Sequence, residues 1–262
     1  MRYIAIFVLL GACLFQGCQS PKSSEEAIKY DGRAGGYPLE KADSVHMNFL
    51  SQEDSVEELG ELEKSLLAAG LVNIQEVIPE ALVELKYSTT DNFFGTDVYG
   101  DLTNAYLQPE VAEMLKKAYD ILQERYPELT LLIYDGVRPR SVQQILWDNL
   151  DKPDSIKPLY VADPTKGGLH NYGVAVDLTL AEKSSGEALD MGTTYDFFGY
   201  PAYPDREDQM LREGKITQAH VNNRKKLRVV MNGAGFSGIG SEWWHFNAFS
   251  RKEAAQKFDI VE

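Results

Sequence analysis

Both cysteines of the chain, Cys13 and Cys18, lie within its first 18 residues, inside an apolar segment. The residues that follow contain no partner for a disulfide, so their fold must be held by a hydrophobic core, with or without a metal ion. Hydrophobic side chains make up 44% of the 262 residues, which is enough for one sizeable core. The sequence therefore predicts one large domain rather than two small ones.

The first residues have the pattern of an export signal. Arg2 is followed by an apolar run from Tyr3 to Phe15, which is too short for a stable transmembrane helix, and then by small residues. A cysteine that closes such a segment resembles the lipobox of bacterial lipoproteins, in which the cysteine is lipidated and becomes the first mature residue. Cys13 fits that pattern better, whereas Cys18 follows a longer apolar stretch and precedes a polar spacer.

We take Cys18 as the lipidation site, while an ordinary cleaved signal with incidental cysteines stays open. The expected location is the cell envelope, as an exported lipoprotein that is periplasmic or associated with the outer membrane. Contact with the membrane would then be through the lipid anchor only. A formal net charge of −14 argues against a nucleic-acid partner, because the chain has no basic surface to contact phosphates.

Three segments follow from the composition along the chain. Residues 1–18 form the export signal, and 19–70 are rich in Ser, Glu, Lys and Gly, which predicts a polar tether with one short acidic helix near 55–69. Residues 71–262 form the packed domain. Its expected strands are Val83–Tyr87, Thr130–Tyr134, Val174–Leu180 and Trp243–Ala248. Its expected helices begin at Pro109, at a Ser141 cap and at Thr217.

These strands and helices alternate without a regular βαβ rhythm. The pattern predicts an α+β fold, a single domain with a mainly antiparallel central sheet flanked by helices. In the strand Val174–Leu180 the even positions are all apolar and should face the core. Asp177 is then directed away from the main core, toward a cleft.

Two of the four histidines, His170 and His245, lie near the carboxylates of Asp177 and Glu242 in glycine-punctuated segments. Catalytic zinc typically has three protein ligands and one open position, and His170, Asp177 and His245 supply such a set. Glu242 is then the natural base for a water whose pKa the zinc lowers. Because three residues separate Glu242 from His245, both can serve one site only if the chain bends between them.

Arg138 lies on a turn fixed by Pro139 and is a suitable cation for the oxyanion that forms when water attacks an amide. Each pattern also has a structural interpretation: a buried histidine is often a core residue with satisfied hydrogen bonds, and an Arg-Pro turn is often a salt-bridged loop. The common His-Glu-x-x-His signature is absent. The residues alone leave a metal hydrolase as one candidate among others.

Longer motifs carry a family resemblance. Residues 168–177 resemble the Ser-x-His-x-x-Gly-x-Ala-x-Asp signature of the zinc D,D-peptidase superfamily, and Glu242-Trp243-Trp244-His245 resembles its Glu-x-Trp-His signature. Segments 87–95, 134–139 and 190–197 resemble further marks of its D-alanyl-D-alanine dipeptidases, peptidase family M15. The similarity runs in order from about Leu71 to Asn247.

This resemblance implies a zinc D,D-peptidase (hedgehog-like) fold, one Zn²⁺ per chain and hydrolysis of the D-Ala-D-Ala dipeptide to D-alanine. It gives His170, Asp177 and His245 as zinc ligands, Glu242 as catalytic base and Arg138 as the transition-state cation. By the same resemblance Asp196 receives the substrate ammonium. Gly168 departs from the signature, since it stands where serine is usual, and this puts the substrate preference in doubt.

Two rival functions remain on the same scaffold. One is a D,D- or L,D-carboxypeptidase that acts on longer peptidoglycan stem peptides, although Asp196 would close the amino-end side of the cleft. The other is a non-catalytic wall-binding lipoprotein, against which the presence of Glu242 argues. The export signal favours a role in cell-wall turnover or scavenging over glycopeptide resistance.

Overall fold

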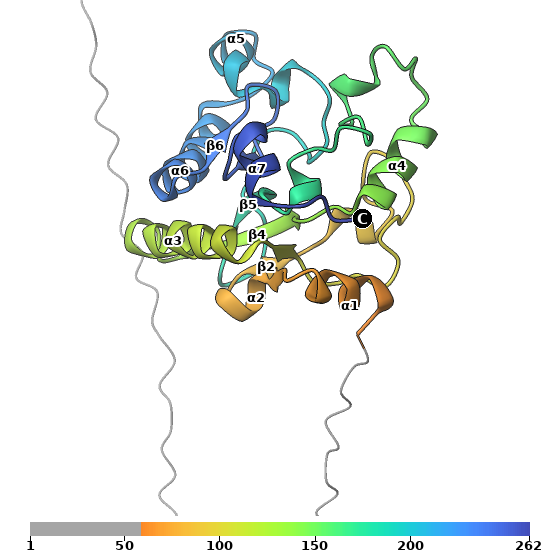
Figure 1. The fold of residues 1–262 in the computed structure, drawn as a ribbon. Coiled ribbons are helices and arrows are strands. Elements are labelled where there is room, and N and C mark those ends of the chain that lie inside the picture. The colour runs from red at the N-terminus through yellow and green to blue at the C-terminus, as the bar shows by residue number, and fades with distance from the viewer. Residues whose placement is uncertain (1–58) are drawn as a thin grey trace, which may run out of the picture. The chain divides into compact units, whose positions relative to one another are not determined.

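A mixed sheet of five strands forms the centre of the computed structural model, which describes residues 59–262 (Figure 1). The strand order is β2-β4-β5-β7-β6; β2 pairs parallel with β4, and all other neighbours are antiparallel. A second, two-stranded sheet joins β1 and β3. The prediction of an α+β fold with a mainly antiparallel sheet is confirmed. The strands are β1 Val72–Asn73, β2 Leu82–Val83, β3 Tyr106–Leu107, β4 Leu129–Asp135, β5 Ala175–Glu182, β6 Ser237–Gly238 and β7 His245–Asn247.

The two longest helices, α3 and α6, lie side by side and contact the sheet, α3 through β4 and α6 through β5 (Figure 1). The helix predicted from Pro109 is α3, and Thr217 caps α6 through its side chain. Among the described residues no helix has the length and apolar character needed to span a bilayer. The helices are α1 Glu61–Ala68, α2 Ile74–Val77, α3 Pro109–Arg125, α4 Arg140–Asn149, α5 Glu207–Arg212, α6 Gln218–Ala234 and α7 Arg251–Lys257.

Three predicted boundaries were wrong. Ser141 is not a cap, because α4 already begins at Arg140 and Pro139 is its capping residue. The strand predicted over Val83–Tyr87 stops at Val83, since the carbonyl of Tyr87 accepts hydrogen bonds from a loop, at the amides of residues 98 and 99. The strand predicted over Trp243–Ala248 is shorter and covers only His245–Asn247, which is β7.

Packing in the described part begins at α1, within the segment 19–70. Leu66 of α1 is fully buried in the core. The carboxylate of Glu63, also buried, accepts hydrogen bonds from the Tyr106 hydroxyl (2.8 Å) and the Asn104 amide (2.5 Å). The expected short helix thus packs as part of the domain. Cys18 and the export signal lie outside the described residues.

Candidate active site

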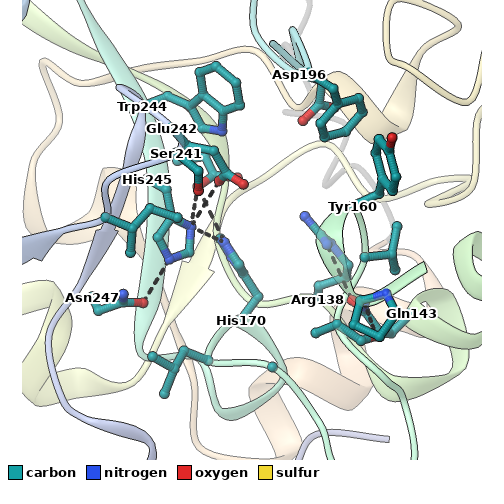
Figure 2. A pocket seen from close by; sticks show the side chains of 18 of the residues that line it. Arg138, Gln143, Tyr160, His170, Asp196, Ser241, Glu242, Trp244, His245 and Asn247 are labelled. Atoms are coloured by element: carbon teal, nitrogen blue, oxygen red, sulfur yellow. Dashed lines mark hydrogen bonds and ion pairs between the residues drawn. The ribbon is translucent and has the colours of Figure 1, made fainter. Parts of the chain in front are cut away.

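All six site residues predicted for the packed domain line one cavity of about 660 Å³ (Figure 2). His170, Glu242 and His245 lie together on one side, and Arg138 lies opposite beside Gln143 and Tyr160. Asp196 lies at a third side, away from the histidines. The predicted residues come from segments far apart in sequence, which the sheet brings together.

Strand pairing places two of the candidate ligands. Asp177 of β5 and His245 of β7 are direct partners in the antiparallel ladder, and Asp177 Oδ1 lies 2.9 Å from His245 Nδ1. His170 lies on the short 3-10 turn that precedes β5, and Gly173, with a φ of 67°, ends that turn. His170 Nε2 is 3.3 Å from Asp177 Oδ1 and 3.2 Å from His245 Nδ1.

These three atoms fit a tetrahedral metal ion. Ligands at about 2.0–2.1 Å from zinc in a tetrahedron are themselves about 3.3 Å apart, close to the separations of the three atoms. His170 Nδ1 donates to the carbonyl of Gly136 (2.7 Å), and His245 Nε2 donates to Asn247 Oδ1 (2.8 Å). The other ring nitrogens, His170 Nε2 and His245 Nδ1, therefore both face Asp177 Oδ1, and a metal ion among these three atoms would be bound by their lone pairs.

Glu242 occupies the bend that the sequence required. Glu242 lies before β7, outside the strand, so its side chain does not follow the alternation of the strand. Its Oε2 lies 3.9 Å from His245 Nδ1. Burial raises the pKa of Glu242 above the ordinary value for a glutamate. A carboxylate at this place can take up a proton and release it again more readily than an exposed glutamate.

Arg138 is buried at the cavity wall and held from three sides. Its Nε and Nη2 donate to Asp135 Oδ2 (3.1 and 2.5 Å), and its Nη1 donates to Gln143 Oε1 (3.2 Å). The guanidinium also lies 4.6 Å from the centre of the Tyr87 ring. The salt bridge expected of an Arg-Pro turn is present, and Arg138 also lines the cavity, where a cation for the oxyanion would have to lie.

Asp196 has an unusual backbone conformation, with a φ of 55°. Its carboxylate accepts a hydrogen bond from the Tyr87 hydroxyl (3.0 Å). Burial and the nearby charge of Asp177 raise the pKa of Asp196 well above its usual range. A cationic group bound in the cavity would stabilise the ionised form of this carboxylate.

Sequence reasoning missed the residues that orient this set. Asn247, Gln143 and Tyr195 bond to His245, Arg138 and Asp177, respectively, and the Tyr195 hydroxyl donates to Asp177 Oδ2 at 2.9 Å. The sequence gives a signal for Asn247 only, because a residue two positions from His245 on a strand lies on the same face. The other bonds depend on loops whose paths no periodicity predicts.

Gly168 lies in close packing at the cavity wall. A Cβ at this position would meet the Cβ of Ala162 at 3.0 Å, so a serine here would require Ala162 to shift. Of the other two histidines, His46 lies outside the described residues. His220 contacts Asp190 and does not line the cavity.

Comparison with known proteins identifies relatives. The family model described as D-ala-D-ala dipeptidase (Peptidase_M15) matches residues 67–261. The D-alanyl-D-alanine dipeptidase of Escherichia coli strain K12 is 36% identical over 176 residues, which cover 67% of this chain and 83% of that protein. That of Enterococcus faecium is 29% identical over 194 residues, covering 68% and 90%. Among solved structures, VanYB in complex with D-alanine-D-alanine shares 13% identity over 58% of this chain and 76% of that chain, with a TM-score of 0.35, too low to bear on function.

Proposed function

The chain belongs to the D-Ala-D-Ala dipeptidase family of metallopeptidases, and from this premise we propose that it hydrolyses the D-Ala-D-Ala dipeptide to D-alanine with one bound Zn²⁺. The observation that carries the proposal is the triangle of His170 Nε2, Asp177 Oδ1 and His245 Nδ1. The same cavity is lined by the Glu242 carboxylate and the buried Arg138 guanidinium.

His170, Asp177 and His245 would hold the zinc. When bound, zinc acts as a Lewis acid that lowers the pKa of water and polarises a carbonyl. Among the described residues no fourth His, Cys, Asp or Glu joins this group, and its three members line the cavity. This is the donor set of a catalytic zinc site, which keeps a position for water.

Glu242 is the proposed catalytic base. Its carboxylate takes the proton of the attacking water and passes it to the nitrogen of the leaving D-alanine. A pKa raised by burial suits this double role, because the carboxylate takes up a proton more readily than that of an exposed glutamate. The bend before β7 keeps Glu242 beside the metal ligands without making it one.

Arg138 is the proposed cation for the negative charge that develops on the carbonyl oxygen of the scissile bond. Asp135 and Gln143 fix the guanidinium before any substrate binds, so little reorganisation is needed during the reaction. An arginine does not lose its charge at any pH the protein meets.

Asp196 is the proposed partner of the substrate ammonium. An unpaired ammonium in a buried cavity would be costly, and a carboxylate at a fixed place makes the free amine a requirement for binding. This favours a dipeptide over a longer stem peptide, because an extended chain would place an amide where the ammonium belongs.

The experiment compares the release of alanine, of either configuration, from D-Ala-D-Ala, L-Ala-L-Ala and a stem pentapeptide that ends in D-Ala-D-Ala, using the zinc-loaded protein. We expect the first to be cleaved with the highest kcat/KM. More efficient cleavage of the pentapeptide would support the carboxypeptidase alternative. Absence of any cleavage would support a non-catalytic wall-binding role and refute the proposal.

We also propose that the protein is an envelope lipoprotein lipidated at Cys18, with a role in cell-wall turnover or scavenging. The support is the sequence pattern of residues 1–18 alone. Mass spectrometry of the mature N-terminus, compared between the natural chain and Cys18→Ser, tests the anchor. A diacylated Cys18 is expected, and an unlipidated N-terminus or lipid at Cys13 would contradict it.

A further inference from the structure

Asp196 is the only residue other than glycine with a positive φ in residues 59–262. It lies in the segment 191–201, which is almost free of regular secondary structure. A non-glycine residue in this region of φ costs free energy, so it persists only where surrounding contacts fix the backbone. The contacts that fix this segment therefore also determine where the Asp196 carboxylate lies.

Arg224 of α6 makes two of these contacts from a fully buried position. Its Nε donates to the carbonyl of Met191 and its Nη2 donates to the carbonyl of Pro201, both at 2.8 Å. The two carbonyls stand at the two ends of the segment that carries Asp196. One rigid guanidinium thus joins both ends of that segment to one helix.

The ion pair of Arg224 with Glu207 is longer than the bonds of Arg224 to the segment. The nearest carboxylate is that of Glu207, whose Oε1 lies 3.6 Å from Arg224 Nη1, and that nitrogen makes no hydrogen bond within residues 59–262. Glu207 is instead engaged by Arg228, which donates to both of its oxygens at 2.7 Å. The short bonds of Arg224 are those to the segment.

The middle of the segment is tied to the metal site. Trp243 Nε1 donates to Thr193 Oγ1 (2.8 Å), and the Tyr195 hydroxyl donates to Asp177 Oδ2 (2.9 Å). With its ends held by Arg224 and its middle held near Asp177, the segment has little freedom to move Asp196 relative to the zinc ligands.

We propose that Arg224 is a positioning residue for substrate recognition: by joining the carbonyls of Met191 and Pro201 it sets the distance between Asp196 and the metal site. This inference rests on the proposed function, in which Asp196 receives the substrate ammonium. The zinc ligands and Glu242 come from β5, β7 and the turns beside them. Loss of the Arg224 bonds should therefore weaken recognition of the ammonium while leaving metal binding intact.

The test replaces Arg224 by lysine, which keeps the charge and much of the volume but lacks the two-armed donor geometry. Arg228→Lys is the matched control, since Arg228 lies one turn further along α6 and contacts Glu207 but not the segment. The substrates are D-Ala-D-Ala and propionyl-D-alanine, which has the same shape without the ammonium. The ratio of their kcat/KM values isolates recognition of the ammonium.

In Arg224→Lys we expect this ratio to fall about tenfold, chiefly through a higher KM for D-Ala-D-Ala, with one zinc still bound. Arg228→Lys should keep the ratio of the unmodified chain. A general structural defect would lower the kcat/KM values of both substrates by the same factor and leave their ratio unchanged. An unchanged ratio in Arg224→Lys would overturn the proposal.

Hydrogen exchange supplies a readout that does not depend on turnover. Amides in 191–201 should exchange faster in Arg224→Lys than in Arg228→Lys, and equal exchange in the two variants would overturn the positioning role. If the unmodified chain did not hydrolyse D-Ala-D-Ala, the proposed function would fail, and the exchange result would still decide whether Arg224 holds the segment.

Discussion

Asp177 and His245 lie opposite each other in the neighbouring strands β5 and β7, with 2.9 Å between Asp177 Oδ1 and His245 Nδ1. The pairing of the two strands thus also fixes two of the three proposed zinc ligands. His170 joins them from the turn that leads into β5. Because this part of the site is built on the central sheet, its geometry depends on the fold rather than on a flexible loop.

Replacing Glu242 by glutamine tests its role as the base. The amide has nearly the same shape but cannot accept a proton, so kcat should fall by about a hundredfold to ten-thousandfold. Zinc content should stay at one ion per chain, because Glu242 is not among the three proposed ligands. Activity close to that of the unmodified protein would show that another group takes the proton.

Replacing Arg138 by lysine tests the fixed cation. Lysine keeps a positive charge but cannot reproduce the bonds to both Asp135 and Gln143, so its ammonium should no longer be held in a fixed position toward the substrate carbonyl. We expect kcat to fall by about a hundredfold or more, with bound zinc unchanged. Arg140→Lys, at a half-buried neighbouring position whose side chain pairs with Glu262, serves as control and should behave like the unmodified enzyme. An effect on KM alone would argue against a role in the transition state.

Asn247→Ala tests the orientation of His245. Asn247 Oδ1 accepts the Nε2 hydrogen of His245, and loss of such a partner typically weakens zinc binding by about 10- to 100-fold. The measurement is a zinc titration against a competing chelator. Asn149→Ala, on the exposed end of α4, should leave the affinity unchanged. Equal zinc affinities in the two variants would show that Asn247 does not orient the His245 imidazole.

Leu66→Ala tests whether α1 belongs to the folded domain. Leu66 is fully buried, whereas the adjacent Leu67 is 37% exposed. We expect Leu66→Ala to lower the free energy of unfolding by about 2–5 kcal/mol and Leu67→Ala to lower it much less. Chemical denaturation of both variants measures the difference. Similar values for the two would mean that α1 is not part of the core.

Much of the site could be predicted from the sequence because its residues lie in short motifs of fixed spacing. His170 and Asp177 are joined by a turn and a strand whose alternation was readable, and Glu242 and His245 are separated by a bend that the glycines before Ser241 suggested. Helix α3, one of the two longest, was also predictable, because its apolar residues recur at the helical period.

The rest depends on contacts between distant segments. Arg224 shows no sign in the sequence of its bonds to Met191 and Pro201, because these join side chain to backbone across loops. Likewise, the sequence predicts Tyr87 as the end of a strand, whereas in the structure its hydroxyl donates a hydrogen bond to the Asp196 carboxylate. The helix α1 was predicted near 55–69, but its packing on the core was not, because most of its residues and those before it are polar.

The most direct test of the account is the anomalous diffraction of zinc-loaded crystals at the zinc absorption edge. The account predicts one zinc peak within bonding distance of His170 Nε2, Asp177 Oδ1 and His245 Nδ1, with a coordination position open to the cavity near Glu242. A zinc ion bound elsewhere, or one whose open position is closed by a fourth protein ligand, would contradict it.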